Sequence, residues 1–120
     1  MIPTTSLELS RKLVAAGMDG SGTEKVWIDA IAPVERWRAV RDYLTILAPA
    51  WTTDELLEEL PKIIKQGRRE YVLSFGPIYD GHGFWASYTD QWDGDELKTV
   101  AKSILPEALG ELLLWQRESE

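Results

Sequence analysis

The chain has no cysteine, which excludes disulfide bonds, thiolate zinc sites and cysteine nucleophiles. It has one histidine, His82, which stands between Gly81 and Gly83. A Ser-His-Asp arrangement would have to use this residue, because histidine is the usual base. A zinc site normally needs more ligands than this chain offers. We interpret His82 as a turn residue and assign it no catalytic or metal-binding role.

Long apolar runs are also missing. No run approaches the roughly 20 residues that span a bilayer, and the longest candidate, residues 108–115, is interrupted by Gly110 and Glu111. The segment Met1–Ser6 lacks the basic region and the long apolar region of a secretory signal. We therefore expect a soluble chain that has no membrane partner.

A basic surface is the third feature that the composition lacks. The net charge is −7 and the pI is about 4.7, whereas phosphate-backbone binding needs a basic footprint. Two short basic groups are interpreted as solvated helix faces and helix ends; they are Arg36, Arg38 and Arg41, and Lys62, Lys65, Arg68 and Arg69. We expect no direct contact with nucleic acid.

What remains is an ordinary globular composition. The 120 residues are 44% hydrophobic and 28% charged, which fits a single domain, residues 1–120, with one core. Periodicity and capping signals predict helices at 5–16, 34–47, 97–105 and 106–115, and a helix from Thr52 or Thr53 to Ile64 that breaks or kinks near Leu60 because of Pro61. Alternation predicts strands at 25–31, 71–75 and 84–89, the last two joined as a hairpin by a loose loop. The predicted fold is α+β, with a small antiparallel sheet of about three strands and helices packed mainly on one face.

Motifs that bind metals or cofactors are absent from this pattern. The acidic group Asp90, Asp93, Asp95 and Glu96 does not have EF-hand spacing and fits a solvated turn. No P-loop is present, and no glycine-rich turn joins a strand to a helix as a dinucleotide fingerprint would. Four glutamates could in principle supply paired carboxylates, although helix-surface glutamates are common; they are Glu55, Glu58, Glu59 and Glu111. We assign no catalytic residue, metal or cofactor.

Six tryptophans in 120 residues are the most unusual feature. On the strand 84–89, alternation places Trp85 opposite Phe84 and Tyr88. On the strand 25–31 it places Trp27 opposite the aliphatic residues, which usually take the inner face. We therefore predict that Trp27 and Trp85 lie on one sheet face and form an interaction surface.

Five segments carry a resemblance to known proteins. They are Thr5–Ser10 with Leu13, the strand around Trp27, Glu55–Pro61, Gly83–Tyr88, and Ala108–Leu109 with Leu112–Trp115. In this order they resemble a group of small phage- and prophage-encoded hypothetical proteins, and the likeness covers most of the chain. The resemblance implies a phage context and no mechanism. Leu105 departs from the group, because a capping Asn or Ser is expected before Pro106.

Three functions are compatible with these observations. The favoured one is a phage-encoded accessory or protein-interaction domain without catalysis, which binds a host or phage protein or a second copy of itself in the bacterial cytoplasm or in the virion. The second is a small enzyme or small-ligand binder that uses residues 80–88. The third is an acidic mimic of nucleic acid that blocks a DNA-binding protein, an interpretation weakened by the interspersed arginines and lysines.

Overall fold

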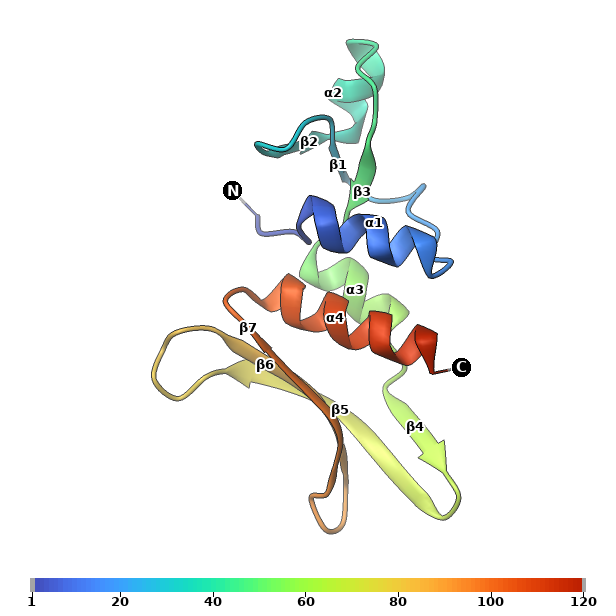
Figure 1. Ribbon diagram of the computed structural model, residues 1–120, viewed down its shortest axis with the longest axis vertical. Helices are drawn as coiled ribbons and strands as arrows, with labels where there is room; N and C mark the ends of the chain where they lie inside the picture. The colour runs from blue at the N-terminus through green and yellow to red at the C-terminus, as the bar shows by residue number, and fades with distance from the viewer. Residues whose placement is uncertain (1, 120) are drawn as a thin grey trace.

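The computed structural model describes residues 2–119 and has an α+β architecture in three tiers (Figure 1). Figure 1 shows a small sheet with the short helix α2 (Arg36–Arg41) at one end, the other helices in the middle and a larger sheet at the other end. The helices of the described chain are α1 (Leu7–Ala15), α2 (Arg36–Arg41), α3 (Thr53–Glu59) and α4 (Leu105–Glu118). The strands are β1 (Lys25–Trp27), β2 (Pro33–Glu35), β3 (Ala48–Ala50), β4 (Ile63–Gln66), β5 (Arg69–Pro77), β6 (Phe84–Asp90) and β7 (Glu96–Lys102).

The strands form two antiparallel sheets, so the predicted sheet of about three strands is only part of the fold. One sheet has the order β2-β1-β3 and the other has the order β4-β5-β6-β7. In the larger sheet β5 and β6 pair from Tyr71↔Asp90 to Pro77↔Phe84, which confirms the predicted hairpin with a loose loop between them. Helix α4 packs on β6 and β7, and α3 and α1 pack on α4.

The main core lies between α4, its neighbouring helices and the larger sheet. Leu109, Leu112 and Leu113 of α4 are completely buried there, as their helical spacing predicts. Pro106 occupies the first turn of α4, where its missing N–H costs nothing. The side chain of Ile104, the N-cap residue, makes no capping hydrogen bond.

The start of α1 differs from the prediction. Ser6, not Thr5, is the N-cap, and its hydroxyl accepts a hydrogen bond from the Leu9 N–H. Thr5 is unavailable because its hydroxyl bonds to Ser10 at 2.7 Å and accepts from the Trp51 N–H at 3.1 Å. The Ser6 N–H donates to the Glu107 carboxylate of α4 at 2.8 Å, so a residue distant in sequence contacts the start of α1.

Two predicted helices are strands over part of their length. The helix capped by Thr52 ends at Glu59, and the residues after Pro61 form β4 instead of a second helical segment. Residues 97–105, predicted as a helix, form most of β7 and the start of α4. In both places isolated apolar residues have helical spacing, but pairing with a neighbouring strand satisfies the backbone.

The predicted strand 25–31 and helix 34–47 are also shorter than expected. Strand β1 ends at Trp27, because the Asp29 carboxylate accepts hydrogen bonds from the N–H groups of Ile31 and Ala32 and holds a turn. Residues 33–35 then form β2 beside β1, and α2 covers only Arg36–Arg41. The segment 48–50 is extended, as predicted, and forms β3.

Candidate functional site

The two tryptophans that the sequence singles out lie in different sheets, so the prediction that they share one sheet face is wrong. Trp27 belongs to β1 in the smaller sheet and is only 9% exposed. Its indole N–H donates to the Thr5 carbonyl at 3.1 Å, which anchors the ring inside the molecule. Trp85 belongs to β6 in the larger sheet and lies over Gly76 of β5, where an added Cβ would stand 3.3 Å from the ring. The interface role of Trp85 remains a prediction.

The residues around His82 form a turn, and the contacts described below shape that turn. The His82 side chain is exposed, and the Asp80 carboxylate accepts a hydrogen bond from the His82 backbone N–H at 3.0 Å. Gly81 and Gly83 both have positive φ, at 80° and 135°. Asp80 and the two glycines therefore set the shape of the turn.

The acidic segment after β6 forms a turn held by its own carboxylates. Asp90 accepts hydrogen bonds from the N–H groups of Trp92 and Asp93 at 2.9 and 3.2 Å, which lowers the pKa of the Asp90 carboxyl. Asp93 and Asp95 both face Arg69, at 3.5 and 3.0 Å. Across residues 2–119 no three His, Asp or Glu side chains are grouped so as to hold a metal ion.

Three of the four glutamates named from the sequence, Glu55, Glu58 and Glu59, line one depression of about 150 Å³ together with Asp19. Glu55 completes a capping box with Thr52 and accepts a hydrogen bond from the Glu24 N–H. Glu59 pairs with Arg117 at 3.4 Å, and Glu111 lines a different depression. Glu55 and Glu59 therefore both make structural contacts, the first in a helix cap and the second in an ion pair.

A surface not expected from the sequence lies at the far end of the smaller sheet. Among the described residues, thirteen large hydrophobic side chains are exposed, and six of them fall within residues 37–47, which we call the α2 tip. These six are Trp37, Val40, Tyr43, Leu44, Ile46 and Leu47. Arg41 stacks on the Trp37 ring at 5.1 Å and pairs with Asp42 at 2.8 Å. Figure 1 shows α2 protruding at one end of the long axis.

Tyr43 has a strained backbone within this surface. It is the one described residue other than glycine with a positive φ, at 54°. The N–H groups of Tyr43 and Leu44 donate to the carbonyls of Val40 and Ala39, which is the Schellman ending of a helix. Helix α1 ends in the same way with Gly17, the residue that this position normally prefers. A tyrosine here strains the backbone, yet its side chain is 95% exposed.

The sequence contained a signal for this surface. Trp37, Val40 and Leu44 have the spacing of a buried helical stripe, and we predicted a helix over 34–47 on that basis. The helix ends at Arg41, and Val40 and Leu44 remain 63% and 40% exposed. The signal is therefore an apolar stripe with helical spacing, which lies on a helix too short to bury it.

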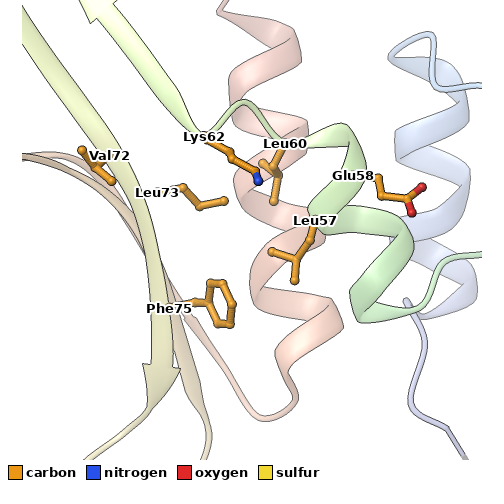
Figure 2. Close-up of a pocket in the computed structure, with 7 residues that line it drawn as sticks. All are labelled: Leu57, Glu58, Leu60, Lys62, Val72, Leu73 and Phe75. Atoms are coloured by element: carbon orange, nitrogen blue, oxygen red, sulfur yellow. The ribbon is translucent and has the colours of Figure 1, made fainter.

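A second apolar surface is a groove of about 670 Å³ between α3 and β5 (Figure 2). Leu57 of α3 faces Leu73 and Phe75 of β5 across it, whereas the Glu58 carboxylate points away. Lys62 lies beside Leu60 at one end. Small-ligand sites usually combine an apolar wall with several converging polar groups. This groove has an apolar wall, but several polar groups do not converge on it.

No family model matches the chain, and no match was found among curated proteins or solved structures. The phage origin implied by the resemblance therefore stays a prediction. Among residues 2–119, no helix is both long and apolar enough to cross a membrane.

Proposed function

We propose that this chain is a protein-interaction domain without catalysis and that the α2 tip is its contact surface. The observation that carries the proposal is the gathering of exposed aromatic and aliphatic side chains within residues 37–47. A monomer rarely leaves such a group in water, because exposed apolar area costs free energy that a partner recovers on binding. The accessory role in a phage remains part of the proposal.

The residue types at the α2 tip support this assignment. Tryptophan, tyrosine and arginine dominate the binding energy of protein interfaces, and the tip presents Trp37, Arg41 and Tyr43 together. Arg41 holds the Trp37 ring by a cation–π contact, so less side-chain entropy is lost when a partner binds. The backbone of Tyr43 is strained, yet no contact within the monomer buries its ring.

The two alternative functions have less support. An enzyme or ligand site within residues 80–88 would need polar groups that converge on a cavity, and the carboxylate of Asp80 is used in the turn. An acidic mimic of nucleic acid would need a continuous acidic stripe. Basic side chains interrupt the acidic surface at Lys12–Glu8, Lys65–Glu70, Arg69–Asp93 and Arg117–Glu59.

A crosslinking experiment with a matched control tests the proposal. A photoreactive phenylalanine derivative replaces Tyr43 in one variant and Tyr79 in the other, because both tyrosines are almost fully exposed. In the native cell we expect a specific protein adduct from position 43, no adduct from position 79, and loss of the first adduct when Trp37→Ser is added. Equal crosslinking from both positions, or an adduct that survives Trp37→Ser, would contradict the assignment.

A further inference from the structure

The distribution of charge sets the α2 tip and its supporting strands apart from the rest of the molecule. Residues 24–47 carry four basic and four acidic side chains, so this segment is neutral. The remaining residues carry nine basic and sixteen acidic side chains, which accounts for the whole net charge of −7. The exposed apolar side chains of the α2 tip therefore belong to a neutral segment, in which the tip itself carries two basic and one acidic side chain.

We infer that the protein docked on the α2 tip is a second copy of this chain, related to the first by a two-fold axis. The inference rests on the proposed function and names its partner. Two copies with seven negative charges each repel one another through their acidic surfaces. At physiological salt the Debye length is about 8 Å, so only charges near the contact matter. Contact through the neutral segment avoids that repulsion, whereas a basic partner would be drawn to the acidic remainder.

The charges at the tip are also complementary to themselves. Arg41 and Asp42 are adjacent, opposite in sign and both exposed, at 59% and 43% of their side-chain area. A two-fold contact brings the same patch of both copies together, so each residue of one copy meets its counterpart region on the other. Arg41 of one copy can then pair with Asp42 of the second, and the reciprocal pair forms at the same time. A surface of one sign could not do this.

The size of the apolar surface suits a dimer contact. A standard interface takes roughly 800 Å² from each partner, and a fully exposed aromatic side chain contributes about 150–250 Å². The tip presents Tyr43 at 95% and Trp37 at 62% exposure, and Val40 lines a depression together with Trp37. The tip lies at one end of a molecule 52 Å long, so this dimer is end to end, with close to twice the monomer's length.

Sedimentation and small-angle scattering of the purified full chain test the inference. We expect a dimer with nearly doubled maximum dimension, and a dissociation constant that rises about thirtyfold or more in Trp37→Ser and Tyr43→Gly, as for interface hot spots. Tyr79→Gly is the matched control and leaves the dissociation constant unchanged. Tyr43→Gly also raises the unfolding midpoint measured at concentrations where every variant is monomeric, because glycine removes the strain. Weaker association together with a more stable monomer cannot come from misfolding.

Two results would overturn the inference. One is a wild-type chain that stays monomeric at every concentration tested. The other is a dimer whose dissociation constant is unchanged in Trp37→Ser and Tyr43→Gly. In either case an adduct to a different protein from position 43 would still support the proposed function, whereas absence of any adduct in the cell would contradict that function as well.

Discussion

Tyr88 shows how one buried polar side chain holds two elements of this fold together. Its ring is fully buried beside Trp115 of α4, with the ring centroids 6.3 Å apart. Its hydroxyl donates to the Pro61 carbonyl at 2.7 Å, in the link between α3 and β4. Burial raises the pKa of the Tyr88 hydroxyl, because the phenolate would lose its hydration.

Tyr88→Phe should therefore change both the stability and its pH dependence. At neutral pH we expect a loss of about 1 kcal/mol, because the Pro61 carbonyl loses its donor. The raised pKa stabilises the fold below pH 10, and this stabilisation is lost as the pH rises above 10, where the unfolded chain ionises first. In urea denaturation the difference between wild type and variant should shrink above pH 10, while the exposed Tyr79→Phe behaves as wild type. Parallel curves for wild type and Tyr88→Phe would refute this account.

The tryptophans show how far the role of a single residue can be predicted from the sequence. Their number indicated an interaction surface, and alternation placed Trp85 on the strand face opposite Tyr88. The sequence could not show that Trp27 has an internal hydrogen-bond acceptor in Thr5, which is 22 positions away. Nor could it show that Trp37 lies on a helix too short to bury it. Both facts depend on contacts between distant segments.

At the scale of elements, α3 is the helix whose start the sequence predicted best. Thr52 accepts a hydrogen bond from the Glu55 N–H, and the Glu55 carboxylate accepts from the Thr52 N–H at 2.8 Å. Such a capping box is encoded within four residues and needs no tertiary contact. The start of α1, in contrast, depends on a tertiary contact. The N–H of its N-cap residue, Ser6, donates a hydrogen bond to the Glu107 carboxylate of α4.

The two adjacent threonines at the start of α3 provide a matched pair for testing the cap. Thr52→Ala should lower the free energy of unfolding by about 1 kcal/mol, because the Glu55 N–H loses its acceptor. Thr53→Ala, one position into the helix, should have little effect, since alanine favours helix. Thermal unfolding of both variants measures the difference. Equal losses would show that the Thr52 hydroxyl contributes nothing specific.

The elements that the sequence predicted wrongly share a physical cause. Leu97 and Val100 have helical spacing, yet β7 has an irregular register with β6 near its start, so both side chains pack against the main core from a strand. Ile63 and Ile64 continue the stripe of α3 in sequence, but Pro61 removes a helical donor and the chain turns back through Gly67 to pair with β5. Sheet pairing over such distances leaves no local trace in the sequence.

The whole molecule is extended because its two sheets pack on opposite sides of the helices. Its radius of gyration is 15.4 Å, against about 13.6 Å for a compact chain of this length. Helix α1 connects the two parts, since it packs on β3 and on α4. The approach is close at Gly110, where an added Cβ would lie 2.7 Å from Leu9. The smaller sheet depends on this connection, because its own core is small.

The smaller sheet and the main core should therefore open with different free energies of local unfolding. The cluster within the smaller sheet consists of Trp27, Ala48 and Ala50, with Leu7 against it, and each of its strands has three residues. The main core joins fourteen buried side chains from the helices and the larger sheet. Few buried contacts and short strands lower the cost of local opening.

Hydrogen exchange at two matched residues measures this difference. Val26 and Ala86 are both completely buried and each lies in a strand with a neighbour on either side. We expect the Val26 amide to exchange at least about tenfold faster, after correction for intrinsic rates, which corresponds to about 1.4 kcal/mol less opening free energy. If two copies associate through the α2 tip, protection of Val26 should rise with protein concentration while that of Ala86 stays constant, because association stabilises the smaller sheet first. Equal protection of the two amides would instead show that the molecule unfolds as one cooperative unit, with the smaller sheet held as firmly as the main core.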